Sequence, residues 1–280
     1  MTLRQQGFTL IEMVVAITVS AVVVGFMTMF LVTPVNEYVA QERRTELNDS
    51  ANSAIRMLKE DIRNALPDSV RVVNVGGSLA LELLSAPYVA RYRPNGSSGV
   101  PAQDLAVGPG MSDSRFSTLG SFAANGTYSG YLVVDHPAGG DAYSGSGVIS
   151  PFASISVEPL VNGEQAVDMG TTSASFPADS PTRSVYLVSG PVSYVCNPAV
   201  GTLTRFDNYP ISMNQAGHAT EAALVAAGAR RSLVARDVSV CTFQYTTTAL
   251  GGPLARLRMT FARNGETLQV FEQVQLENRP

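Results

Sequence analysis

The chain has 280 residues, of which 45% are hydrophobic, and its formal net charge is −4. With 19 lysines and arginines against 23 carboxylates, the composition excludes a basic polyanion-binding surface over the whole molecule. The length allows one sizeable domain or two small ones after a long N-terminal helix. Six arginines form two local clusters that we predict to be solvated faces: Arg230, Arg231 and Arg236, and Arg256, Arg258 and Arg263.

An apolar run near the N-terminus begins beside a single carboxylate, Glu12. No residue from 13 to 35 is charged, and 23 helical residues at about 1.5 Å each span a hydrocarbon core of roughly 30 Å. An ionised carboxylate in that environment costs on the order of 2.5–3.5 kcal/mol, so a partner is expected. Cleavage after Gly7 would supply one, because the new amine of Phe8 would lie one helical turn from Glu12 or near the Glu12 of a neighbouring copy.

Two other targeting segments are alternatives. An ordinary signal-anchor with a stray acidic residue at its edge would explain the same run. A secretory signal fits less well, because its apolar core is about 7–15 residues long and is followed by a small-residue cleavage site. Here the run is longer, and no A-x-A pattern follows it.

The segment from Gly7 to Glu12, GFTLIE, with the basic residue Arg4 before it, resembles the type IV prepilin signal. The resemblance implies that a membrane-embedded prepilin peptidase removes residues 1–7 and methylates Phe8. It also implies that Glu12 assists docking of the subunit into a helical filament. Pilins, minor pilins and secretion pseudopilins share this signal.

The apolar pattern predicts that the helix continues beyond the membrane and ends before Pro67. Apolar residues recur every three or four positions and form one stripe of an amphipathic helix: Leu47, Ala51, Ile55, Leu58, Ile62 and Leu66. Gly25 and Pro34 interrupt the first half and are candidate bends. We therefore divide the chain into a leader (1–7), a membrane and assembly helix (8–35), an amphipathic helix (36–67) and a head (68–280).

The head shows strand periodicity and predicts an α+β fold, with the long helix packed on a mostly antiparallel sheet. The expected strands are 70–75 paired with 79–83, then 130–135, 184–188, 192–196, 202–206 and 238–246, and finally 255–262 paired with 267–276 across Asn264-Gly265. A short helix is expected within 220–229. Residues 93–150 are rich in Gly, Ser, Pro and Asn, and predict a loop-rich insertion with little core. Five aromatic residues at and within it are expected to pack against the head: Tyr88, Tyr92, Phe116, Phe122 and Tyr128.

The only two cysteines, Cys196 and Cys241, predict one disulfide in an extracytoplasmic domain, with two unpaired buried thiols as the alternative. Their spacing offers no metal site. Asp135, His136 and Asp141 adjoin Pro and Gly and indicate a polar turn, with a calcium loop as the weaker interpretation. No nucleophile elbow, phosphate loop or H-E-x-x-H motif is present, so we expect neither an enzyme nor a cofactor.

A second resemblance, to J-type minor pseudopilins and to the MshO family of MSHA pilus biogenesis proteins, involves residues 60–71, 235–241 and 273–278. It implies a low-abundance subunit that helps to start or cap a pilus. The implied partners are the prepilin peptidase, other minor pilins, the major pilin and an inner-membrane assembly platform, and no nucleic acid. The implied location is the inner membrane with a periplasmic head, and later the pilus tip. A type II secretion pseudopilin and a pilus-tip binding module are the alternatives.

Overall fold

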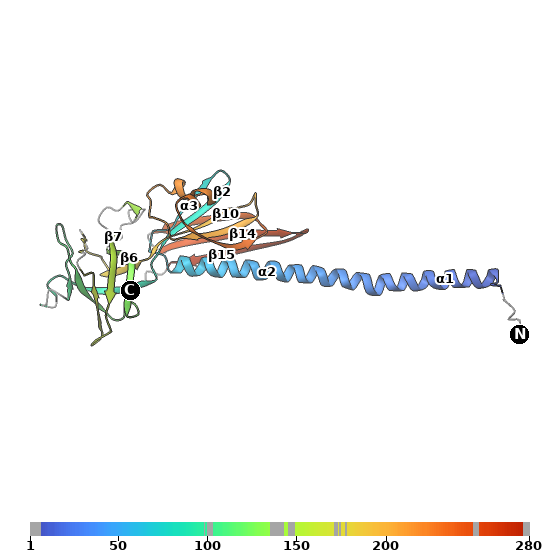
Figure 1. Cartoon of the computed structure of the whole chain (residues 1–280), viewed down its shortest axis with the longest axis horizontal. Coiled ribbons are helices and arrows are strands. Elements are labelled where there is room, and N and C mark those ends of the chain that lie inside the picture. Colours follow the sequence, from blue (N-terminus) through green and yellow to red (C-terminus); the bar gives the residue numbers. More distant parts are fainter. Residues whose placement is uncertain are drawn as a thin grey trace. The chain divides into compact units, whose positions relative to one another are not determined.

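The computed structural model describes residues 7–97, 99, 103–134, 143–144, 149–170, 173, 175–176, 178–248 and 252–276. Two compact units divide the chain, Met1–Asp49 and Ser50–Pro280, and each is described by itself. The first unit is helical, and the second, the head, holds the end of one helix and all of the strands (Figure 1). The fold is α+β with mostly antiparallel pairing, as the sequence predicts.

The N-terminal helix consists of α1 (Leu10–Met27), a π-helical turn η1 (Thr28–Val32) and α2 (Thr33–Arg63). No residue of α1 is buried, and Leu10–Phe30 is apolar and long enough to cross a membrane. The π-helical turn ends two residues before Pro34. Proline has no backbone N–H, so one i→i−4 hydrogen bond is lost there, and the wider turn accommodates that loss. At Pro34, where the sequence predicted an interruption, the helix changes its pitch and continues into α2.

The end of α2 provides the apolar stripe that packs in the head. Its buried members are Ala51, Ala54, Ile55, Leu58 and Ile62. The helix ends at Arg63, three residues earlier than the stripe predicts. Leu66 is still buried, but its N–H donates to the carbonyl of Leu84 at 2.8 Å, so this residue already belongs to the sheet.

Two antiparallel sheets accompany the end of α2. The five-stranded sheet has the order β1-β2-β10-β11-β12, with β1 Arg71–Val75, β2 Ser78–Ser85, β10 Gly190–Asn197, β11 Thr202–Asp207 and β12 Arg230–Arg236. The three-stranded sheet has the order β13-β14-β15, with β13 Val238–Thr248, β14 Gly252–Arg263 and β15 Glu266–Gln275. A 3₁₀ turn, Gln215–His218, and the predicted short helix, α3 Glu221–Ala226, lie between β11 and β12. Figure 1 shows β14 and β15 running beside the head end of α2.

Two of the hairpins form where the turn chemistry predicts them. Gly76 and Gly77 (φ +60° and +84°) join β1 to β2, and Asn264 and Gly265 (φ +49° and +85°) join β14 to β15. Both turns need positive φ at two successive residues, which glycine and asparagine adopt at low cost. The turns fix the register of each strand pair, and so determine which side chains face the core.

The remaining strands form a seven-stranded sheet, and a β3–β9 pairing closes it on itself. Its order is β4-β3-β5-β8-β7-β6-β9, with β3 Tyr88–Pro94, β4 Asp104–Leu105, β5 Arg115–Leu119, β6 Gly126–Val134, β7 Ile149–Val157, β8 Glu164–Asp168 and β9 Ser184–Val188. Closure gives six of the strands a partner on each side, and only the two-residue strand β4, which pairs with β3 alone, lies outside the ring.

This closed sheet corrects the expectation for residues 93–150. That region was predicted to be loop-rich with one strand and little core, but it holds β4, β5 and β6 and the start of β7. Tyr92, Phe116 and Phe122 are buried in a core cluster of its own, and Tyr88 meets Tyr128 edge to face at 5.5 Å. Short strands between Gly-rich and Ser-rich turns have a loop-like composition, and their pairing partners lie far away in the sequence.

The predicted disulfide is confirmed. Cys196 on β10 and Cys241 on β13 are bonded, with Cα atoms 6.4 Å apart and 45 residues of sequence separation. Because β10 and β13 belong to different sheets, the bond joins the five-stranded sheet to the three-stranded sheet.

Replacing Cys241 by serine is expected to lower the free energy of unfolding of the head by roughly 2–4 kcal/mol, because it releases a loop that the disulfide constrains in the unfolded chain. Urea denaturation of residues 36–280, expressed in the periplasm, measures the change. The double variant Cys196→Ser/Cys241→Ser is the control and should match the reduced wild-type head. Two reactive thiols in the denatured, unreduced wild-type protein would contradict the bond.

Candidate functional site

The start of α1 places the prepilin-type residues at a capped helix terminus. Thr9 is the N-cap, with extended backbone angles, and its hydroxyl oxygen accepts a hydrogen bond from the N–H of Glu12 at 3.3 Å. Glu12 therefore occupies the third position of the helix, where unpaired backbone N–H groups and the helix dipole favour a negative charge. Sequence reasoning missed this role of Thr9, although T-x-x-E before an apolar run is a capping-box pattern.

Gly7 and Phe8 lie before the first helical turn and are exposed. The backbone of Gly7 is not in the left-handed region, and a Cβ built there meets no described atom within 4 Å. The fold of this chain therefore imposes no need for glycine at this position. Any such need would come from a protein that binds the segment.

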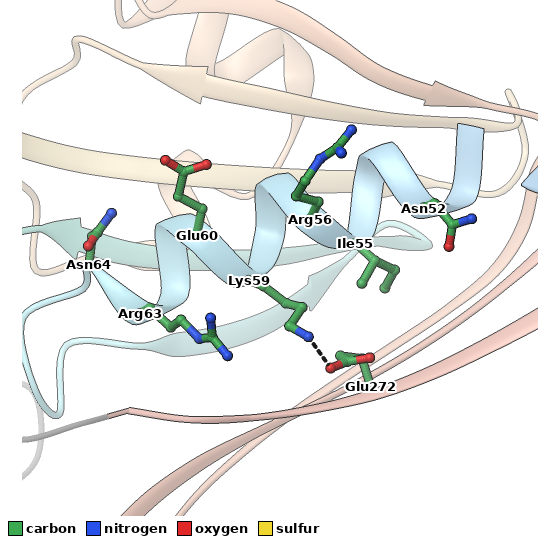
Figure 2. Close-up of a pocket in the computed structure, with 8 residues that line it drawn as sticks. All are labelled: Asn52, Ile55, Arg56, Lys59, Glu60, Arg63, Asn64 and Glu272. Atoms are coloured by element: carbon green, nitrogen blue, oxygen red, sulfur yellow. Dashed lines mark hydrogen bonds and ion pairs between the residues drawn. The ribbon is translucent and has the colours of Figure 1, made fainter. Parts of the chain in front are cut away.

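A groove runs along the solvent-facing side of α2 and reaches β15. Its volume is about 700 Å³, and its lining residues are Asn52, Ile55, Arg56, Lys59, Glu60, Arg63, Asn64 and Glu272. Figure 2 shows Lys59 and Arg63 directed to the side of α2 on which Glu272 lies, and Glu60 directed to the opposite side. The Lys59 ammonium contacts the Glu272 carboxylate at 2.5 Å, which connects α2 to β15. No sequence pattern predicted this groove, because Lys59 and Glu272 are 213 residues apart.

A charged network holds α2 against the five-stranded sheet. Asp61 accepts hydrogen bonds from the Tyr194 hydroxyl at 2.6 Å and from the Arg205 guanidinium at 2.7 Å. Arg205 also pairs with Asp207, which in turn binds Arg230 at 2.8 Å. Burial alone would raise the pKa of Asp207, but hydrogen bonds from Arg230 and Arg205 outweigh it and hold the pKa below its usual range. The carboxylate therefore stays ionised, and the network positions the groove-lining face of α2.

Replacing Asp61 by asparagine is expected to destabilise the head by about 1–3 kcal/mol, because Arg205 loses a charged hydrogen-bond acceptor in a half-buried position. Glu60→Gln, one residue earlier on the exposed side of α2, is the matched control and should change stability by less than about 0.5 kcal/mol. Denaturant unfolding of both variants makes the comparison. Equal stability of the two variants would show that the network does not hold the helix.

Glu82 is a second buried carboxylate, and its contacts indicate a structural role. One of its oxygens accepts from Arg71 Nε at 2.8 Å and the other from the Tyr209 hydroxyl at 3.1 Å. Burial raises the pKa of Glu82, and the charge of Arg71 opposes the shift. Because both oxygens accept hydrogen bonds, Glu82 connects Arg71 of β1 to Tyr209 in the segment after β11 and stabilises the core between them.

In the described part of the chain, no three His, Cys, Asp or Glu side chains gather as metal ligands. Asp135, His136 and Asp141, the predicted polar turn, lie outside the described residues, as do Arg4 and the tail 277–280. Of the predicted site residues, Gly7 and Phe8 lie just before α1 and Glu12 lies in its first turn, whereas the two cysteines lie in the head.

Comparison with known families finds the prokaryotic N-terminal methylation motif at residues 2–28. No curated protein and no solved structure matches the chain. The motif marks a type IV pilin-like prepilin signal and supports a pilin-like or pseudopilin protein, which is a structural rather than a catalytic class. It implies processing by a prepilin peptidase and assembly with other pilins, and the apolar helix Leu10–Phe30 fits membrane anchoring.

Proposed function

We propose that this chain is a minor pilin of an MSHA-like type IV pilus that starts or caps filament assembly together with other minor pilins. The observation that carries the proposal is the prepilin signal at the start of a membrane-length helix, with Glu12 in the first helical turn. Resemblance to MshO and to J-type minor pseudopilins, in residues 60–71 and 235–241, supports the assignment to this kind of pilus.

The proposed processing and docking use the residues at the helix start. A prepilin peptidase cuts after Gly7 and methylates Phe8, and the exposed position of both residues gives it access. The Glu12 carboxylate pairs with the Phe8 amine of a neighbouring subunit, or with its own, as the subunit leaves the membrane. This pairing offsets the cost of a carboxylate in lipid.

The size of the head supports a minor rather than a shaft subunit. The unit Ser50–Pro280 combines the two sheets beside α2 with the closed seven-stranded sheet. A compact unit of that length has a radius of gyration of about 17 Å. Such a head is difficult to repeat where N-terminal helices stack closely, but it fits at a tip. The proposed path runs from the inner membrane, with residues 68–280 in the periplasm, to the pilus tip.

Deletion of the gene is expected to reduce filament number sharply while the major pilin accumulates in the inner membrane. Electron microscopy counts the filaments, and immunoblots of membrane fractions follow the major pilin. Complementation with the wild-type gene is the control and should restore piliation. Normal piliation with lost attachment would replace this function with a tip-binding role, and normal piliation with lost protein secretion would identify a secretion pseudopilin.

A further inference from the structure

The outer strand of the three-stranded sheet, β15, has a long open edge. It pairs with β14 alone among the described strands, and its ten residues contain no proline and no register shift. The Asn264-Gly265 turn makes Arg263 and Glu266 a hydrogen-bonded pair, so every second residue from Glu266 bonds to β14. The alternate residues Thr267, Gln269, Phe271 and Gln273 therefore present their N–H and C=O groups to the open edge.

These four outward positions have no backbone partner elsewhere in the described chain. Natural proteins commonly protect such an edge with a proline, a bulge, a cover or a closed sheet. The seven-stranded sheet of this same head is closed, whereas β15 pairs without a bulge and carries a Phe271 side chain that is 60% exposed. A regular, unprotected edge with an exposed aromatic residue has the features of a site for strand addition.

The charges beside this edge indicate what kind of strand fits. Arg258 lies opposite Phe271 and Arg256 opposite Gln273, and both arginines are exposed on the side of the sheet turned away from the buried Leu257 and Met259. Neither arginine forms an ion pair with a described residue; Arg258 donates only to the side chain of Gln269, at 3.4 Å. No described residue on this side of β13, β14 and β15 is acidic.

The opposite side of an added strand would meet mixed charge, because the groove beside α2 is lined by cationic side chains and also by Glu60 and Glu272. In that groove Lys59 is already paired with Glu272 of β15, which forms the far wall (Figure 2). Arg63 forms no ion pair within the described residues. An added strand would lie about 5 Å from β15 and about 10 Å from β14, distances that arginine and glutamate side chains together can span. A strand whose carboxylates lie on the same side as Arg256 and Arg258 is therefore complementary to this edge.

We propose that the β15 edge binds an extended acidic segment of a neighbouring pilin-type subunit by strand addition. The choice of a pilin-type subunit as the binding partner rests on the proposed function. The description of the edge and its charges is independent of that function. A second copy of this chain fits less well, because pairing two β15 edges would bring two Arg256/Arg258 pairs toward each other.

Photocrosslinking in cells that assemble the filament tests the proposal. The full-length chain carries p-benzoylphenylalanine in place of Gln273, and the crosslinked partner is identified by mass spectrometry. We expect a crosslink to another pilin-type subunit at an extended acidic segment. Gln269→Pro removes an outward N–H without breaking a bond to β14, and Arg256→Glu/Arg258→Glu reverses the charge. Each should reduce the crosslink on the order of tenfold, because blocking the edge or repelling an acidic strand weakens docking.

Arg91→Glu, an exposed arginine on β3, is the matched control and should leave the crosslink unchanged. Formation of the Cys196–Cys241 bond verifies folding of each variant. No crosslink, a crosslink to lipid or to a second copy, or a crosslink that persists in both edge variants would overturn the proposal. If any of these crosslinking results occurred while the deletion strain still showed reduced piliation, only the proposal for the β15 edge would be rejected. Normal piliation in the deletion strain would instead refute the proposed role of the protein in pilus assembly.

Discussion

Replacing Gly7 by valine is expected to block removal of residues 1–7 almost completely. Nothing described near Gly7 requires glycine for the fold, so a branched side chain there disturbs the fit to the peptidase and leaves the protein otherwise intact. Pulse-chase labelling followed by gel electrophoresis distinguishes precursor from mature chain. Uncleaved protein should remain in the inner membrane.

Gly25→Ala is the matched control for this experiment. Gly25 lies within α1, where an added Cβ meets no described atom within 4 Å, so the variant should be processed at the wild-type rate. If Gly7→Val matured as fast as Gly25→Ala, cleavage after Gly7 would be refuted.

Replacing Glu12 by valine is expected to abolish incorporation into filaments while leaving cleavage and membrane insertion intact. Removing the carboxylate favours insertion by on the order of 2.5–3.5 kcal/mol. The Thr9 hydroxyl still caps the helix through the backbone N–H of residue 12, so the helix begins at the same place. The variant loses the proposed pairing with the Phe8 amine and the favourable placement of the charge at the helix N-terminus.

The distribution of the subunit between sheared filaments and membranes measures this effect. Glu37→Val is the control, because Glu37 is exposed beyond the candidate span Leu10–Phe30 and has no proposed role in docking. Normal amounts of Glu12→Val in the filament fraction would refute the charge-pair role of this residue.

Local patterns predicted the parts of the fold that local physics determines. The apolar run, the Ala51–Ile62 stripe and the two hairpin turns each contain their signal within a few neighbouring residues, and the structure has them close to the expected positions. The end of α2 was placed three residues late, because the bond from Leu66 to Leu84 on a distant strand cannot be read from the helix itself.

The closed sheet could not be predicted in the same way. Its strands β5 and β8 are only five residues long, and closure depends on the contact of β3 with β9, about 95 residues later. The same limit applies to the groove and to the Asp61–Arg205 pair, whose members lie 144 residues apart. The prepilin-type site could be recognised because Gly7, Phe8 and Glu12 lie within one short segment.

The mass of the mature N-terminus tests the central proposal most directly. Protein isolated from assembled filaments is digested, and the N-terminal peptide is sequenced by tandem mass spectrometry. A processed pilin-type subunit predicts a peptide that begins with N-methylated Phe8 and lacks residues 1–7. A peptide that begins at an intact Met1 on assembled protein would contradict the account.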